Sequence, residues 1–377
     1  MSAAPSYPPD PPHTPIAQLT SVLVVGGCGF LGHHVVRQIL SYHPTARVSV
    51  LDLRINVNQF PNVEYHAGDI TDRARVDEVL RITKPSAVID TVSPIAGLPR
   101  EVQFKVNVEG TRTVLEASQA AGVKAFVWTS SASVCFDGRS DVINQDETAP
   151  YPEVPMDSYN ETKAIGERMV LEANREGGML TCALRLSGLF GEGDRQMLPG
   201  MLGVLARGQT KFQIGNNDNL FDFTYIGNSA YAHILAAEHL HVLLSHSSLP
   251  PKTPSTVDGE AFLITNGSPV YFWDMPRAIW ALKGHFAPYH IVFPKQLGVV
   301  MGAGGEFVGW LLGKEPGFTR FKVKFSCWNR YFCIDKAKKM LGYKPLWDLQ
   351  EGLVRGVKWF EEEEQRAKEQ QAAKKGQ

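Results

Sequence analysis

Hydrophobic and polar positions follow two alternating patterns along the first half of the chain. Short apolar runs recur at 21–25, 47–51, 63–66, 87–92 and 125–129. Longer segments lie between some of them, with apolar residues three or four positions apart, at 31–42, 72–82 and 106–121. Buried strands give the first pattern and amphipathic helices give the second. Their alternation predicts an α/β protein with a doubly wound parallel (Rossmann) sheet and helices on both faces.

The first strand breaks into closely spaced glycines just before the first helix. The glycines that carry this spacing are Gly26, Gly29 and Gly32. Such glycines let the backbone turn sharply, let a pyrophosphate approach the main chain, and let the helix pack on the strand. Gly27 with the last two also satisfies the ordinary dinucleotide fingerprint, so the spacing leaves the subfamily open. Phe30 and Leu31 start the helix, whose free N–H groups would face the phosphates; the alternative is a turn that binds nothing.

Acidic residues follow the next two strands. Asp52 ends the second strand about twenty positions beyond the glycines, where it would accept hydrogen bonds from the adenosine ribose hydroxyls. This position favours NAD over NADP, although the nearby Arg54 leaves NADP open. Asp69 and Ile70 follow the third strand and would hold the adenine, unless Asp69 is an ordinary turn residue.

A Ser, Tyr and Lys in this order indicate hydride-transfer chemistry. Ser131 follows the fifth strand, and Tyr159 and Lys163 lie one helical turn apart on one face of the next helix. A neighbouring ammonium favours the phenolate, so that Tyr159 can take the proton of an alcohol while hydride leaves to the cofactor. Ser131 would hydrogen-bond the same oxygen. Alone the Tyr/Lys pair would be an ordinary helix pair, but with the glycine turn and Asp52 it predicts a catalytic site.

Composition narrows the class of protein. The chain has 377 residues, 44% hydrophobic, and a formal net charge of -1, which gives no support for a nucleic-acid partner. Its five cysteines form no Cys-x-x-Cys pair, so we interpret them as reduced. His233, His239 and His241 share one helical segment but lack further ligands at suitable spacing, so we expect no metal site.

The same patterns predict the domain organisation. Residues 1–19, with six prolines, are expected to be a disordered or extended arm, and 361–377 a charged tail. Residues 20–190 would form the NAD-binding domain, to which about 226–266 return. Residues 191–225 and 267–360 would form a smaller mixed α/β lobe that covers the substrate.

At these residues the chain resembles the extended short-chain dehydrogenase/reductase family, over nearly its whole length. Within it, the chain is similar to the sterol branch of the 3β-hydroxysteroid dehydrogenases. The motifs that carry the likeness are Asn107-Val-Glu-Gly-Thr, Pro152-Glu-Val-Pro-Met-Asp-Ser-Tyr-Asn-Glu-Thr-Lys-Ala, Phe190-Gly-Glu-Gly-Asp-Arg-Gln, the stretch 212–225, Leu312-Gly-Lys-Glu-Pro-Gly and Lys336-Ala-Lys-Lys-Met-Leu-Gly-Tyr-Lys-Pro. These long motifs are far more specific than the glycine turn.

The resemblance implies NAD-dependent oxidation of the 3β-hydroxyl of a 4α-carboxysterol. Once carbon 3 is a ketone, the carboxylate on carbon 4 belongs to a β-keto acid and leaves as CO₂. Carried over residue by residue, Tyr159 is the base, Lys163 the ribose anchor and phenol tuner, and Ser131 the partner of the substrate oxygen. The resemblance also implies partner enzymes of sterol C4-demethylation and a peripheral place on the cytoplasmic face of the endoplasmic reticulum membrane. It leaves a homodimer open.

Two residues depart from the family pattern, and one segment raises the question of a membrane. Family members usually have His at the position of Asp90 and Pro at that of Leu186. Residues 297–312 are apolar and glycine-rich but shorter than the ~20 residues that span a bilayer. We expect an interfacial helix there, with Trp310 at its end; the alternative is a buried helix of the lobe.

Three other functions stay open at this point. A nucleotide-sugar epimerase or dehydratase would share the fold and the Tyr/Lys pair, although a dehydratase usually has an acidic pair beside the catalytic Ser, and Ser133 and Val134 provide none. An enzyme of a specialised triterpenoid pathway would use the same chemistry on another ring system. A non-catalytic NAD-sensing regulator would not need to keep Tyr159, Lys163 and Ser131 together.

Overall fold

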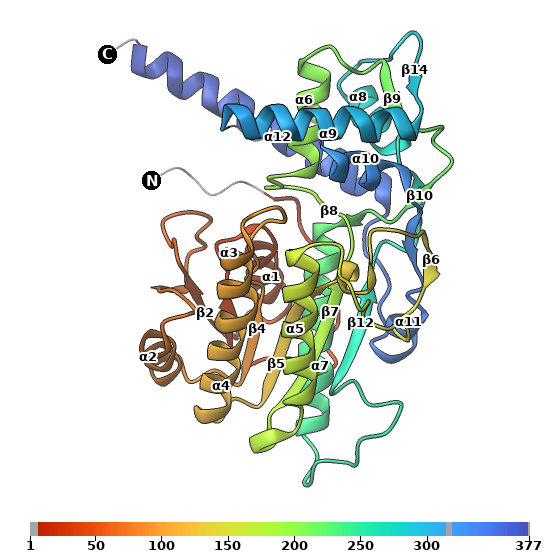
Figure 1. The fold of residues 1–377 in the computed structure, drawn as a ribbon. Helices are drawn as coiled ribbons and strands as arrows, with labels where there is room; N and C mark the ends of the chain where they lie inside the picture. Colours follow the sequence, from red (N-terminus) through yellow and green to blue (C-terminus); the bar gives the residue numbers. More distant parts are fainter. Residues whose placement is uncertain (1–6, 314–318, 376–377) are drawn as a thin grey trace.

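A seven-stranded sheet forms the centre of the computed structural model, which describes residues 7–313 and 319–375 (Figure 1). All neighbouring strands are parallel, in the order β12-β7-β5-β4-β1-β2-β3. The strands are β1 (Ser21–Val25), β2 (Arg47–Asp52), β3 (Glu64–Ala67), β4 (Ala87–Asp90), β5 (Ala125–Ser131), β7 (Leu180–Leu186) and β12 (Glu260–Ile264). The doubly wound parallel sheet that the sequence predicts is confirmed.

Helices cover both faces of this sheet. α1 (Phe30–Tyr42) and α7 (Ile226–Leu244) pack together on one face, and α2 (Arg73–Thr83), α4 (Thr111–Ala120) and α5 (Ser158–Glu172) cover the other. Successive strand residues enter opposite cores: Val24 and Val127 join the core under α1 and α7, whereas Leu23 and Phe126 join the other. Burial on both faces explains why the strands have continuous apolar runs.

A smaller mixed lobe stands at one end of the sheet (Figure 1). Its sheet has four strands in the order β13-β10-β15-β6, and two further pairs are β11 with β8 and β14 with β9. The small strands are β6 (Val142–Gln145), β8 (Leu189–Phe190), β9 (Phe212–Ile214), β10 (Leu220–Phe221), β11 (Thr224–Tyr225), β13 (Val270–Tyr271), β14 (Ile291–Phe293) and β15 (Arg330–Phe332). The helices around them are α6 (Met197–Ala206), α8 (Asp274–Leu282), α9 (Lys295–Leu312), α10 (Arg320–Cys327), α11 (Asp335–Met340) and α12 (Leu349–Lys375). Because β6 falls within 20–190 but pairs with β15, the two parts interleave.

Residues 7–19 have the extended one of the two states that we expected for the arm. The Asp10 carboxylate lies 2.6 Å from the Arg37 guanidinium, and the His13 ring lies 2.9 Å from the Glu238 carboxylate. Leu19 is buried at the start of the sheet. The charged and aromatic side chains between the prolines therefore hold this extended segment against α1 and α7, because they find buried partners there. Residues 1–6 lie outside the described part of the chain.

The structure also gives the bounds of two further segments that we had predicted, the charged tail and the helix over 106–121. Residues 361–375 of the expected charged tail continue α12, and the side chains of 361–373 are largely exposed. The predicted helix over 106–121 is interrupted: α3 (Arg100–Phe104) leads into a π-helical turn, Lys105–Gly110, before α4 begins. Among the described residues, none of the helices has the length and apolar character required to cross a bilayer.

Candidate active site

The glycine turn between β1 and α1 is packed so closely that side chains would not fit. A Cβ on Gly32 would lie 2.2 Å from the Gly26 carbonyl oxygen, and one on Gly29 would lie 3.1 Å from the same atom. Gly26 itself has a φ of +79°, which L side chains rarely adopt. α1 begins without a side-chain cap, so the first N–H groups of the helix remain available to an anion. These features fit the pyrophosphate of a dinucleotide.

Asp52 is held beside this turn at the end of β2. Its Oδ2 accepts a hydrogen bond from the Cys28 N–H at 3.0 Å, and its Oδ1 accepts one from the Arg54 N–H at 3.1 Å. The Gly26 N–H donates to the Leu51 carbonyl at 2.8 Å, which joins the two loops. Each carboxylate oxygen keeps a further lone pair, so Asp52 can also accept from ribose hydroxyls.

Asp69 and Ile70 lie after β3, along the same edge of the sheet. The Asp69 carboxylate accepts a hydrogen bond from the Thr71 N–H at 2.9 Å, and this bond, with the charge of Lys105, lowers the pKa of Asp69. Ile70 is buried, and a Cβ on Gly110 would lie 2.5 Å from its side chain. Ile70 therefore positions the π-helical turn, while Asp69 is a solvent-facing carboxylate.

Ser131 and Tyr159 meet where β5 ends and α5 begins. The side chains of Ser131 and Ser93 face the phenol of Tyr159 and lower its pKa. Ser131 Oγ also lies 2.7 Å from Ser133 Oγ. Asp157 caps α5 by accepting a hydrogen bond from the Asn160 N–H at 2.9 Å, so Tyr159 projects from the first helical turn.

Burial raises the pKa of Tyr159 above its usual value, because a phenolate loses solvation there. The side chains of Ser131 and Ser93 and the charge of Arg330 act in the opposite direction. A phenol in this setting needs nearby positive charge before it can act as a base near neutral pH.

Lys163 is fully buried one turn further along α5. Its Nζ donates to the Thr129 carbonyl at 2.8 Å and lies 4.5 Å from the centre of the Trp128 ring. Burial lowers the pKa of Lys163 to about 8, while the carboxylates of Asp90 and Glu167 favour the charged form. The ammonium that we expected beside the phenol is thus directed at β5.

Asp90, where the family pattern has His, is buried at the end of β4. Its Oδ1 accepts a hydrogen bond from the Val92 N–H at 3.0 Å, and its Oδ2 has no partner among the described residues. Burial raises the pKa of Asp90 to about 6, against the effects of that hydrogen bond and of the Lys163 charge. A buried carboxyl group therefore acts on Lys163 at this position.

The second departure, Leu186, leaves its strand intact. β7 runs through Leu186, which pairs with Ser131 on β5 and Ile264 on β12. The chain turns two residues later at Gly188, whose φ is +43° and where a Cβ would lie 2.7 Å from the Asp222 carbonyl. Glycine, rather than proline, therefore makes the turn after this strand.

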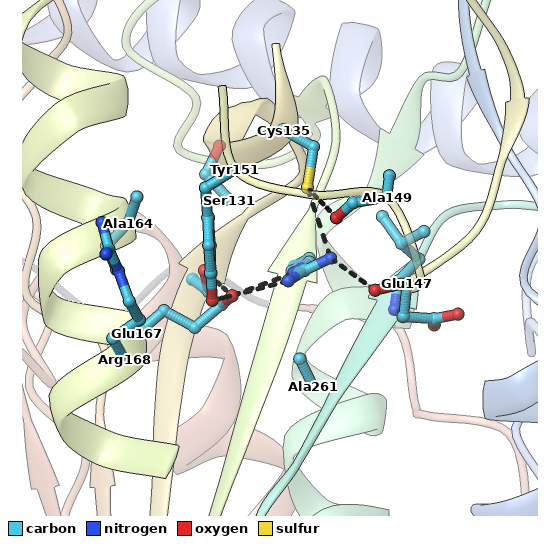
Figure 2. A network of polar contacts seen from close by, with 12 residues as sticks. Ser131, Cys135, Glu147, Ala149, Tyr151, Ala164, Glu167, Arg168 and Ala261 are labelled. Carbon is cyan, nitrogen blue, oxygen red and sulfur yellow. Dashed lines mark hydrogen bonds and ion pairs between the residues drawn. The ribbon is translucent and has the colours of Figure 1, made fainter. Parts of the chain in front are cut away.

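Sequence reasoning missed a buried polar network next to Ser131 (Figure 2). The Arg185 guanidinium on β7 makes a two-pronged ion pair with Glu167 on α5, with bonds of 2.7 and 3.1 Å to the same oxygen. Ser130 and Tyr151 donate hydroxyl hydrogen bonds to the same carboxylate. No motif could reveal this network, because its members are brought together only by the packing of α5 on the sheet.

Two other residues had no role assigned from the sequence, for similar reasons. Asn107 lies in the π-helical turn and donates hydrogen bonds to Gln103 and Thr162, each at 3.1 Å. A π-turn often marks a functional segment, but sequence periodicity does not show it. Arg330 on β15 lies near Tyr159, far away along the chain.

The histidines on α7 have ordinary partners. His233 hydrogen-bonds with the Thr129 hydroxyl at 2.9 Å and with the Ser229 carbonyl. Over residues 7–313 and 319–375, we find no group of three or more His, Cys, Asp or Glu side chains suited to a metal ion.

With this geometry established, comparisons with known proteins place the chain. Residues 23–295 match the sequence profile of the 3-beta hydroxysteroid dehydrogenase/isomerase family. The chain belongs to this 3β-hydroxysteroid dehydrogenase family. A relative in Schizosaccharomyces pombe, named sterol-4-alpha-carboxylate 3-dehydrogenase, decarboxylating, is 48% identical over 92% of this chain and 98% of its own length. The human protein of the same name is 35% identical, over 89% of this chain and 87% of its own length.

Solved structures share the fold of this 3β-hydroxysteroid dehydrogenase family member. An epimerase from Methanothermobacter thermautotrophicus has a TM-score of 0.71 at 21% identity and covers 94% of this chain and 95% of its own. The UDP-glucose 4-epimerase of Thermus thermophilus, solved with NAD, has a TM-score of 0.67 at 20% identity and covers 90% and 98%. At such identities the likeness describes the fold alone.

Proposed function

We propose that this protein is an NAD-dependent sterol-4α-carboxylate 3-dehydrogenase (decarboxylating). It oxidises the 3β-hydroxyl of a 4α-carboxysterol to the 3-ketone, and the C4 carboxylate leaves as CO₂. The similarity to relatives of that name over nearly the whole chain carries the proposal. It is supported by the meeting of Ser131 and Tyr159 at the same edge of the sheet as the glycine turn.

The side chains divide the chemistry as follows. Bound NAD supplies the acceptor for the hydride that leaves carbon 3. Ser131 holds the substrate hydroxyl, and Tyr159 as phenolate takes its proton. Lys163 keeps positive charge close to this region and anchors the ribose. In the resulting β-keto acid the bond from carbon 4 to the carboxylate breaks, and its electron pair moves into an enolate whose oxygen faces Ser131 and the now neutral Tyr159.

The decisive assay mixes the protein, NAD and a 4α-carboxysterol. We expect reduced cofactor together with a 3-ketone that is one carbon lighter. Turnover of UDP-glucose without net cofactor reduction would favour the epimerase, and NAD binding without turnover would favour the regulator. A preference for a triterpenoid carboxylate over the sterol would favour the specialised pathway.

The cofactor site has its own test. Gly32→Ala is expected to abolish NAD binding, because its Cβ would lie 2.2 Å from the Gly26 carbonyl oxygen. Gly200→Ala in α6 is the matched control, because a Cβ there meets nothing within 4 Å. Calorimetric titration with NAD measures both variants. Equal affinities would contradict the assignment of the glycine turn.

We also propose that α9 attaches the protein peripherally to the cytoplasmic face of the endoplasmic reticulum membrane. The apolar side chains that α9 exposes are Leu297, Val300, Met301, Phe307, Val308 and Leu311. α9 packs on α10, and Phe325 of α10 packs against the Arg330 guanidinium, whose charge acts on Tyr159. One helix layer therefore separates this apolar surface from the reactive groups. Such an arrangement suits a substrate dissolved in lipid. The side chain of Trp310 and residues 314–317 of the Leu312–Gly317 motif lie outside the described residues.

Co-sedimentation with phosphatidylcholine vesicles tests this attachment. The double variant Val300→Asp/Phe307→Asp should lose most of its vesicle-bound fraction, whereas Val154→Asp, a similarly exposed control that does not belong to α9, should not. An unchanged bound fraction in the double variant would contradict the proposal. Contact with other enzymes of sterol C4-demethylation and formation of a homodimer stay predictions.

A further inference from the structure

Arg330, the first residue of β15, buries a positive charge inside the lobe. The residue is 7% exposed. Its guanidinium carbon lies 4.6 Å from the centre of the Phe136 ring, 5.1 Å from that of Phe325 and 5.7 Å from that of Phe221. Aromatic rings compensate a cation in part, but they offer no acceptor for its N–H groups.

The guanidinium of Arg330 has neither an ion pair nor a hydrogen bond among the described residues. Its Nε is fully buried and without a partner. Asp157 is the carboxylate whose charge acts on it, yet Asp157 lies beyond ion-pair distance and caps α5 through the Asn160 N–H. An unpaired buried charge is costly, so its retention calls for a reason outside the fold.

Arg330 is also connected to the reactive edge. The Asn160 side chain, next to Tyr159 in α5, donates a hydrogen bond to the Phe136 carbonyl at 3.3 Å, and the Phe136 ring packs against the Arg330 guanidinium. Arg330 and Tyr159 act on each other electrostatically. The other buried cation of the site, Lys163, already donates to the Thr129 carbonyl.

The chemistry of the substrate places an anion in this region. In a 4α-carboxysterol the carboxylate is bonded to the carbon next to the one that carries the hydroxyl. When Ser131 and Tyr159 hold that hydroxyl, the carboxylate must lie within a few bond lengths of them. A planar guanidinium with free N–H groups is the natural partner for a carboxylate.

We propose that Arg330 binds the carboxylate of the substrate and thereby selects acidic sterols over neutral 3β-hydroxysteroids. The inference rests on the proposed function, whose substrate it makes specific. A neutral steroid would leave the guanidinium unpaired, so the site favours the acid both by attraction to it and by the cost of the alternative.

The test compares two substrates with the wild-type enzyme, Arg330→Met and Arg330→Lys. The substrates are a 4α-carboxysterol and the matched 4α-methyl-3β-hydroxysterol, each with saturating NAD. Arg330→Met should lower kcat/KM for the acid roughly 10- to 100-fold, the loss expected for a charge-assisted hydrogen-bonded pair, mainly through KM. Oxidation of the neutral sterol should change less than about threefold, and Arg330→Lys should recover part of the acid activity.

Thermal unfolding provides a second, independent measurement. Met keeps the packing against the three rings and removes the unpaired charge, so the Tm of Arg330→Met should equal or exceed that of the wild type. A variant that fails to fold or melts much earlier would show that the guanidinium is structural and would overturn the inference.

The remaining outcomes separate the two proposals. A wild-type enzyme that oxidises the acid and loses both substrates equally on Arg330→Met, or keeps its preference for the acid, overturns the role of Arg330 alone. A wild-type enzyme that oxidises the neutral sterol and not the acid overturns the proposed function, and the inference with it.

Discussion

Two buried arginines near the reactive edge differ in what surrounds them. Arg185 is 4% exposed and Arg330 is 7% exposed, so both have lost nearly all contact with water. Arg185 meets the Glu167 carboxylate, which Ser130 and Tyr151 also bind (Figure 2). Arg330 meets only aromatic rings among the described residues. A closed network of charges holds the fold together, whereas an open one is available to a ligand.

The largest expected effect concerns Tyr159, on which the charge of Arg330 in the open network acts. Tyr159→Phe removes the proposed base and should lower kcat roughly 10²- to 10⁴-fold while NAD affinity stays nearly the same. Stopped assays with the carboxysterol and calorimetric titration with NAD measure the two quantities. Retained activity would refute the assigned base.

In the closed network around Glu167, the substitution Arg185→Met should lower the free energy of unfolding. It leaves the Glu167 carboxylate buried without its counter-charge, which costs about 3–5 kcal/mol of unfolding free energy. Denaturant titration measures this loss. The double variant Arg185→Met/Glu167→Leu should recover much of it, because both charges are then gone; a double variant as unstable as the single one would contradict this explanation.

The departure at Asp90 predicts a shift in the pH profile. The Asp90 carboxylate favours the ammonium form of Lys163, whose pKa lies at about 8, so Asp90→Asn should lower the pKa of Lys163 further. A smaller fraction of the Asp90→Asn molecules then carries Lys163 as an ammonium at alkaline pH. For this variant, kcat/KM at pH 8 should be roughly threefold lower than at pH 6.5. The pH dependence of kcat/KM measures the shift. An alkaline limit that stays in place, or moves upward, would exclude this coupling.

The smallest expected effect on activity again concerns the closed network. Tyr151→Phe removes one of the hydroxyls that bind Glu167, while Arg185 and Ser130 remain. Stability should fall by about 1 kcal/mol and activity should stay unchanged. Thermal unfolding and the carboxysterol assay make this variant the matched control for Tyr159→Phe, since each removes one tyrosine hydroxyl from α5 or its surroundings.

Sequence patterns predicted correctly the features that depend on residues close together in the chain. Strand and helix periodicity located the first five strands of the seven-stranded sheet, and the glycine spacing located a turn in which the Gly32 position admits no side chain. At residues 7–19, composition left a disordered and an extended state both open. Asp10 and His13 find buried partners on α1 and α7 there, which composition does not reveal.

The sequence by itself determined the sheet, the turn and the residue types of the proposed chemistry, because these depend on short-range steric and hydrophobic rules. Only the tertiary structure decided the electrostatics of the site. In the folded chain the Lys163 ammonium donates to the Thr129 carbonyl, and the Asp90 carboxylate favours the charged form of Lys163. Arg185 forms an ion pair with Glu167. Among the described residues, the tertiary structure also left the Arg330 guanidinium without an ion pair, although the charge of Arg330 acts on Tyr159. Such energies depend on burial and on distances between remote parts of the chain, and no sequence pattern encodes either one locally.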